Sequence, residues 1–284
     1  GSYIYRVKRV RAQILIKKIK VMMKRKAGRP RKNVNNSNVT FSVNTVKMND
    51  LSFNDDLFNP MKTKTRVDQF FSNEGGIMPG VNYVGTGDPG VGKTTVLLDI
   101  LADVKNSGKK CLFISGEMNA IDMVGYVKRF PKFGDLDILF MGDYSEVNPD
   151  VVLRTALKEG YDLVLIDSMA EVADMYTDYF GGTNKSNQGK LLQLFEEHNL
   201  GNNNAKLNSS FLIIQQVTKG GNFAGSNKLK HMTTGMLHMR MSDEGRYLHF
   251  SKNRRGGNGN KLFFSLSGRG KVEYLHEEPI NQID

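Results

Sequence analysis

Apolar runs alternate with amphipathic segments through the middle of the chain. Short runs of mostly apolar residues predict buried strands at 81–86, 111–116, 137–141, 162–167 and 210–216. Between them, apolar residues recur at helical spacing and predict helices near 93–106, 119–130, 148–159 and 186–198. This alternation is typical of an α/β fold, in which helices cover both faces of a mostly parallel central sheet.

The pattern changes after residue 234. Apolar and polar residues now alternate in four short runs: MLHMRMS, RYLHFSKN, KLFFSLS and KVEYLH. Asp-Glu-Gly and glycine-rich turns separate these runs. We therefore expect C-terminal antiparallel hairpins that extend the central sheet.

The charge is distributed unevenly along the chain. Residues 1–32 contain 13 Lys and Arg and no Asp or Glu, although the chain as a whole has 40 basic and 29 acidic residues. Such a run favours nucleic-acid phosphates or is a solvated tail. The asparagine-rich stretch NVNNSNVTFSVN that follows is typical of a linker. We expect a basic, largely disordered arm and linker over 1–60 and one folded domain over 61–284.

Two details of the arm bear on its role. The segment AGRPRK, from Ala27 to Lys32, resembles an AT-hook that lies in the DNA minor groove, although Ala27 stands where that motif has arginine. Gly1-Ser2 resembles a cloning remnant, and an alternative is that the natural start is Met22 or Met23. The arm is therefore a candidate for duplex DNA binding.

Composition excludes several classes of protein. The sequence has no run of 18 apolar residues, so we expect no transmembrane helix. Its single cysteine, Cys111, lies in an apolar run and excludes an internal disulfide framework or a cysteine zinc cluster. We expect a buried core thiol and a cytoplasmic protein of a bacterium or a phage-infected cell.

A phosphate-binding motif follows the first predicted strand. The pattern G-x-x-x-x-G-K-[ST] is formed by Gly87, Asp88, Pro89, Gly90, Val91, Gly92, Lys93 and Thr94, with Thr95 next. Glycines let backbone N–H groups surround an anion, and the helix N-terminus that follows favours phosphate. Lys93 is expected to reach the β- and γ-phosphates of ATP, and the Thr94 hydroxyl to ligate Mg²⁺.

Carboxylates end two other predicted strands. Asp167 ends an apolar strand, where ligands bind in open α/β sheets, and is a candidate for the Mg²⁺ shell. Glu117 follows the strand CLFIS and is a candidate general base for the attacking water. For both, the alternative is a side chain that caps the helix that follows.

Two further strand ends carry polar residues. Gln215 and Gln216 end the strand SSFLII, and a glutamine there is a candidate to sense the γ-phosphate and pass that signal into the glycine-rich, basic loop that follows. The segment LHFSKNRRGGNGN offers Lys252, Arg254 and Arg255 at a strand end as candidate cations that stabilise transition-state charge on a neighbour's nucleotide. The alternative is a solvated basic turn.

Five motifs together resemble the RecA-like core of the RadA/Sms recombination ATPases. They are GGIMPGVNYVGTGDPGVGKTT, FISGE, VLIDS, QQVTKGGNFAGSNKLKHM and SKNRRG, and the match covers roughly residues 64–275. The wider group includes RecA and DnaB-type hexameric helicases. The sequence contains no counterpart of the four-cysteine zinc module or the Lon-protease-like domain of RadA.

The resemblance implies roles for these residues. Lys93 and Thr94 bind phosphate and Mg²⁺, Glu117 is the catalytic base, and Asp167 is the Walker-B acid. Gln216 occupies the sensor position, and the cations Lys252 and Arg254 act in trans on a neighbouring subunit.

The implied protein is a Mg²⁺- and ATP-dependent, DNA-stimulated motor that assembles as a ring, with a hexamer expected, or as a filament. Single-stranded DNA is expected to contact two flexible loops, Tyr176–Lys190 and Thr218–Lys230. Tyr176, Tyr179, Phe180 and Phe223 either stack on bases or pack against the sheet. Two rivals are an ATP-driven oligomeric switch of the KaiC type that acts on protein partners, and a DNA-tethering protein with a vestigial ATPase.

Overall fold

The computed structural model describes residues 42–50, 58–201, 208–216, 233–267 and 270–280. The chain divides into two units, 1–53 and 54–284. In the first unit, the described residues contain the short 3₁₀ helix η1 (Met48–Asp50). Most of the predicted arm, residues 1–41 and 51–57, lies outside the described residues, and the predicted loop Thr218–Lys230 with Phe223 lies wholly outside them. The division at residue 60 therefore stays a prediction.

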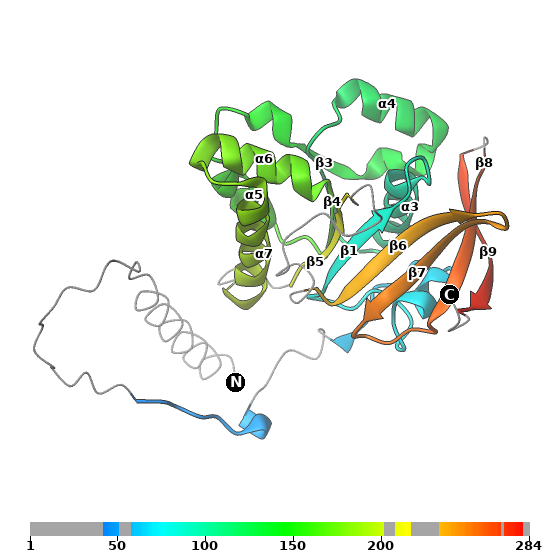
Figure 1. Ribbon diagram of the computed structural model, residues 1–284, viewed down its shortest axis with the longest axis horizontal. Coiled ribbons are helices and arrows are strands. Elements are labelled where there is room, and N and C mark those ends of the chain that lie inside the picture. Colours follow the sequence, from blue (N-terminus) through cyan, green and yellow to red (C-terminus); the bar gives the residue numbers. More distant parts are fainter. Residues whose placement is uncertain (1–41, 51–57, 202–207, 217–232, 268–269, 281–284) are drawn as a thin grey trace, which may run out of the picture. The chain divides into compact units, whose positions relative to one another are not determined.

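A nine-stranded sheet forms the centre of the second unit in the described residues, with the strand order β3-β2-β4-β5-β1-β6-β7-β8-β9 (Figure 1). Six strands are parallel: β1 (Asn82–Gly87), β2 (Cys111–Ser115), β3 (Asp137–Phe140), β4 (Leu163–Asp167), β5 (Ser210–Ile214) and β6 (Gly235–Ser242). Three antiparallel strands extend the sheet: β7 (Gly245–Asn253), β8 (Asn260–Ser267) and β9 (Lys271–Pro279). The predicted parallel sheet with C-terminal antiparallel hairpins is confirmed.

Helices cover both faces of the parallel part. The described elements are α2 (Val67–Phe71), α3 (Lys93–Asn106), α4 (Ala120–Arg129), η3 (Pro131–Asp135), η4 (Met141–Tyr144), α5 (Pro149–Leu157), α6 (Met169–Phe180) and α7 (Asn184–Gly201). Successive strand residues point to opposite faces, so Phe113 packs with α2, α3 and α4 in one core, whereas Ile114 packs with α5, α6 and α7 in the other. The predicted strands and helices agree with the observed ones within three residues at each end.

The lone cysteine lies in the first of these cores. Cys111 is buried, and burial raises the pKa of its thiol to about 12. A protonated thiol in an apolar environment is unreactive. The predicted core role of Cys111 is confirmed.

Helix α6 corrects one prediction. The segment Tyr176–Lys190 is not a flexible loop, because it consists of the end of α6, a short turn and the start of α7. Apolar residues at helical spacing hold α6 on the sheet, and Tyr176 is 1% exposed with its hydroxyl donating to Asp150 Oδ1 at 2.9 Å. Tyr176 therefore packs in the core and does not face DNA, whereas Tyr179 and Phe180 are 50% and 44% exposed.

None of the helices within the described ranges combines the length and the apolar character that crossing a bilayer requires.

Candidate functional site

Four neighbouring parallel strands bring the predicted site segments together at their carboxyl ends, which are called the site edge below. In spatial order, β2 is followed by Glu117, β4 ends at Asp167, β5 is followed by Gln216, and β1 leads into the phosphate loop Gly87–Thr94. The N–H of Gly116 donates to Asp167 O at 2.8 Å and ties the ends of β2 and β4 together. The carboxyl edge of a parallel sheet is where open α/β folds bind ligands.

The phosphate loop needs its glycines for conformation and for close approach. Gly90 and Gly92 adopt positive φ angles of 75° and 94°, and a Cβ on Gly87 would lie 2.7 Å from the backbone oxygen of Met239. Gly92 is the N-cap of α3 and has no side chain to accept the first N–H groups of the helix. Those N–H groups therefore remain available to an anion, as a phosphate site requires.

Two side chains of α3 are already directed at this edge. Lys93 Nζ donates to Gly87 O at 3.1 Å, across the loop itself. The Thr94 hydroxyl donates to Asp167 Oδ2 at 2.5 Å. Burial raises the pKa of Asp167, and so does the charge of Glu117, while the Thr94 hydrogen bond and the charge of Lys93 act in the opposite direction.

The hydroxyl and carboxylate fit a magnesium site. Mg²⁺ prefers oxygen ligands and is usually held by one or two protein groups together with substrate phosphates and water. Thr94 and Asp167 supply such a pair beside the loop. The described part of the chain contains no cluster of three or more His, Cys, Asp or Glu that could hold a metal ion by themselves.

The helix-capping alternative does not apply to either carboxylate. The N-cap of α4 is Asn119, whose side chain accepts from the N–H groups of Ile121 and Asp122, and the N-cap of α6 is Ser168. Glu117 lies exposed in the turn before α4, and Asp167 lies one residue before its helix cap. Both carboxylates are therefore available for chemistry at this edge.

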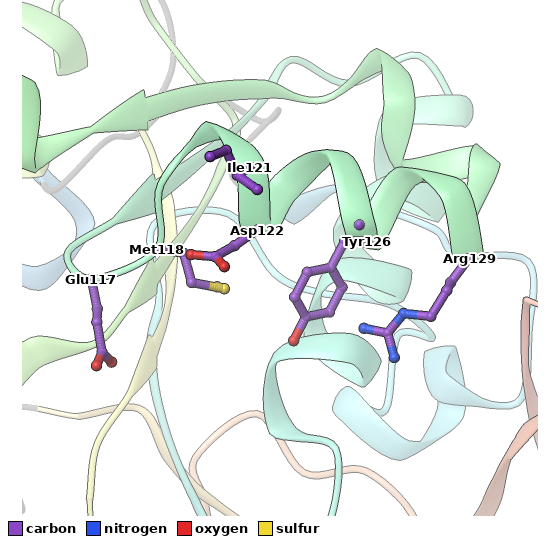
Figure 2. Close-up of a pocket in the computed structure, with 7 residues that line it drawn as sticks. Glu117, Met118, Ile121, Asp122, Tyr126 and Arg129 are labelled. Atoms are coloured by element: carbon purple, nitrogen blue, oxygen red, sulfur yellow. The ribbon is translucent and has the colours of Figure 1, made fainter.

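A groove that the sequence did not indicate begins at Glu117. It has a volume of about 560 Å³ and follows α4 (Figure 2). Tyr126 and Arg129 project to the same side of the helix, and the Arg129 guanidinium carbon lies 5.0 Å from the Tyr126 ring centroid. The only local signal was the i, i+3 spacing of these two residues, which is common on solvated helices. The groove is lined by Glu117, Met118, Ile121, Asp122, Gly125, Tyr126 and Arg129.

The two adjacent glutamines after β5 have different environments. Gln215 is fully buried, its backbone N–H donates to Gly85 O at 2.8 Å, and its side chain donates to Gln188 Oε1 at 2.8 Å. Gln216, the predicted sensor, is exposed at the site edge, and its N–H donates to Gln215 Oε1 at 3.1 Å. The sequence pattern predicts no separate role for Gln215.

The predicted trans-acting cations lie away from this edge. Strand β7 is antiparallel to β6, so β7 ends where the parallel strands begin, at the end of the sheet opposite the site edge. Lys252 there is aligned with Met236. Gly87 is aligned with Met239, three residues further along β6. The structure therefore does not bring Lys252 to the phosphate loop of its own chain, and Arg254 lies further still, lining a cavity of about 400 Å³.

Comparison with known proteins finds DNA repair proteins that are similar in sequence to this chain. No protein-family model matches the chain. It is 29% identical over 232 residues to the DNA repair protein RadA of Streptococcus pneumoniae, covering 78% of this chain and 51% of that protein. RadA of Aquifex aeolicus is 30% identical over 206 residues (70% and 43%), and RadA of Listeria monocytogenes 32% over 213 residues (72% and 43%). The chain thus spans about half the length of these curated relatives.

Among solved structures, the KaiC-like protein PH0186 from Pyrococcus horikoshii OT3 has a similar fold. The TM-score is 0.59 at 17% identity, and the match covers 77% of this chain and 99% of that chain. At this level of identity the likeness concerns the fold.

Proposed function

Because this chain carries a RecA-like core of the RadA type, we propose that it is a Mg²⁺-dependent ATPase motor that acts on DNA as a ring or filament. The observation that carries the proposal is the meeting of the phosphate loop, the Thr94–Asp167 pair and Glu117 at one edge of the sheet. A phosphate-binding loop next to two carboxylates is the arrangement that phosphoryl transfer to water requires.

Binding begins at the loop. The glycine backbone and the first N–H groups of α3 receive the phosphates, and Lys93 exchanges its bond to Gly87 O for a phosphate oxygen. Thr94 and Asp167 would hold Mg²⁺, which would supply positive charge to offset that of the bound phosphates.

Hydrolysis needs a base and a charge stabiliser. Glu117 is exposed at the same edge and acts as the base that takes a proton from the attacking water. Lys252 and Arg254 complete the site of an adjoining copy, because their own strand ends at the opposite edge. Such cations stabilise the charge that spreads over the transferred phosphoryl group. A working site is then built from two chains.

DNA is the proposed partner. The curated relatives named above are DNA repair proteins. The corner between α6 and α7 exposes Tyr179 and Phe180, and Lys190 Nζ lies 5.7 Å from the Phe180 ring centroid. Aromatic and basic side chains together suit single-stranded DNA. The loop Thr218–Lys230 and the basic arm, for duplex DNA, complete the proposed contacts.

A second candidate is an ATP-driven switch that acts on protein partners, and the fold shared with a KaiC-like protein is compatible with either function. ATPase activity measured with and without single-stranded DNA separates the two. Stimulation supports the motor, and turnover that DNA leaves unchanged supports the switch.

Two substitutions test the chemistry. Lys93→Ala is expected to lower ATP turnover by at least about 100-fold, because the loop has no second basic side chain that could replace Lys93 at the phosphates. Glu117→Gln is expected to keep nucleotide affinity within about threefold while abolishing turnover, because it removes a base and not a phosphate contact. Lys105→Ala on the same helix and Glu146→Gln in an exposed turn are the matched controls. Full turnover in Lys93→Ala would refute the proposal.

A further inference from the structure

Three side-chain amides form a hydrogen-bonded chain from the end of β5 to the start of α6. Gln215 Nε2 donates to Gln188 Oε1 at 2.8 Å, and Gln188 Nε2 donates to Asn184 Oδ1 at 2.6 Å. Asn184 Nδ2 then donates to Ala170 O at 2.9 Å and to Asp174 Oδ1 at 2.7 Å. Gln215 and Gln188 are 0% and 3% exposed.

The far end of the chain fixes the orientation of every amide in it. A backbone oxygen only accepts hydrogen bonds, so Asn184 must turn its Nδ2 toward Ala170 and its Oδ1 toward Gln188. Gln188 must then donate to Asn184 and accept from Gln215. This leaves the Oε1 of Gln215 as the acceptor for the N–H of Gln216. The backbone of Gln216 is thus linked to α6 through three amide side chains that satisfy their hydrogen bonds in only one arrangement of donors and acceptors.

The two ends of the chain are functionally distinct. Gln216 lies at the site edge, between the ends of the strands that carry Asp167 and the phosphate loop. At the other end, α6 begins directly after Asp167 and Ser168, and Asn184 opens α7 at the exposed α6–α7 corner. Burying amides in an apolar core costs stability unless each is satisfied, and leucines would fill this space without that requirement.

We propose that Gln215 and Gln188 are positioning residues for ATP hydrolysis, which hold the Gln216 backbone at the site edge in a place set by α6 and α7. The inference rests on the proposed ATPase function. Neither side chain touches the nucleotide, so loss of the chain changes the rate of the chemical step and leaves the affinity for ATP in place. The chain also lets a displacement of the α6–α7 corner reach the site.

The experiment compares Gln188→Leu, Gln215→Leu and the double variant with Gln193→Leu. Gln193 lies on the same helix, is exposed, and donates to Glu197 Oε1 at 2.9 Å. We expect each single variant to lower kcat by about tenfold with KM for ATP within twofold, and the double variant to lose no more than either single one. Gln188→Glu should not rescue kcat, because a carboxylate cannot donate to Asn184. Gln193→Leu should behave as wild type.

A second measurement separates this inference from the proposed function. Hydrogen exchange at the Gln216 N–H, followed by NMR, should be at least fivefold faster in Gln188→Leu than in Gln193→Leu, with no ATP present. If the wild type shows no ATP turnover, the proposed ATPase function is refuted. Faster exchange in Gln188→Leu would still support the hydrogen-bonded link between Gln188 and the Gln216 backbone. Unchanged kcat in both single variants, multiplied effects in the double variant, or unchanged exchange overturns the inference.

Discussion

Mixing two inactive variants tests whether the catalytic site is built from two chains. Lys93→Ala has a defective phosphate loop but intact cations at the end of β7. The double variant Lys252→Ala/Arg254→Ala has intact loops but lacks those cations. We expect each protein to be inactive by itself, and the mixture to recover ATPase activity.

The structure gives the distance between Arg254 and the phosphate loop of its own chain. Gly87 is aligned with Met239 of β6, and the N–H of Arg254 donates to the backbone oxygen of Thr234, which precedes Met239 by five residues along the same segment. At about 3.4 Å per residue, about 17 Å of sheet separates Arg254 from the loop of its own chain. An arginine cannot act on its own nucleotide across that span without rearrangement of the sheet.

The expected recovery follows from counting interfaces. In an equal mixture with free exchange and head-to-tail contacts, about a quarter of the interfaces place an intact loop next to intact cations. Such cations contribute about 10³–10⁵ to the rate in related phosphoryl-transfer systems, so these hybrid sites dominate the signal. The mixture should therefore approach about a quarter of the wild-type rate.

The assay is steady-state ATP turnover of the mixture with single-stranded DNA, after subunit exchange has been shown with labelled chains. A mixture of each variant with the wild type is the control for poisoning of assemblies. Confirmed exchange without recovered turnover would contradict the two-chain site, and the cations would then act within one chain or only on structure.

Two other predictions concern the supports of the site. Gly92→Ala should lower Tm by several degrees and weaken nucleotide binding, because φ of Gly92 is 94° and the new Cβ would lie 2.5 Å from Leu266 Cδ1. Adding Leu266→Ala should restore part of the lost Tm. If Tm is not restored, backbone strain at residue 92 accounts for the loss. Burial, with the nearby charges of His238, Arg240 and Lys261, lowers the pKa of His249 to about 4. Between pH 6.5 and 4 the unfolded chain binds a proton at His249 that the folded chain does not, so stability is retained above pH 6.5 and falls as the pH falls. His249→Gln should flatten urea-unfolding stability over this window, and an unchanged slope would contradict the assignment.

Much of the edge was predictable because its chemistry requires particular residues in a particular order. A loop around phosphate needs glycine at positions such as Gly92, and the carboxyl end of a parallel strand needs a carboxylate such as Asp167 to hold Mg²⁺. These requirements are local, so the strands, the loop and α3 could be placed from short segments. The roles of these residues in catalysis stay predictions.

What could not be predicted depends on neighbours in space. The strand β5 is apolar on both faces, so the sequence does not show which of Gln215 and Gln216 points into the core. Helix α6 was missed although Ser168 and Glu171 form a capping box at its start, because the glycine- and asparagine-rich residues after it indicated a loop. The groove along α4 depends on where that helix lies above α3, which no local pattern specifies.

The outermost strands of the sheet, β3 and β9, are poorly suited to pairing with strands of other chains. A free edge exposes unpaired N–H and C=O groups and invites other chains to add strands. At one side β3 is only four residues long and begins with the exposed Asp137. At the other, β9 carries Lys271, Glu273 and Glu278 and ends at Pro279, which lacks a donor. Both sides are therefore poor templates for aggregation, and replacing charges on β9 by apolar residues would remove the protection on the longer one.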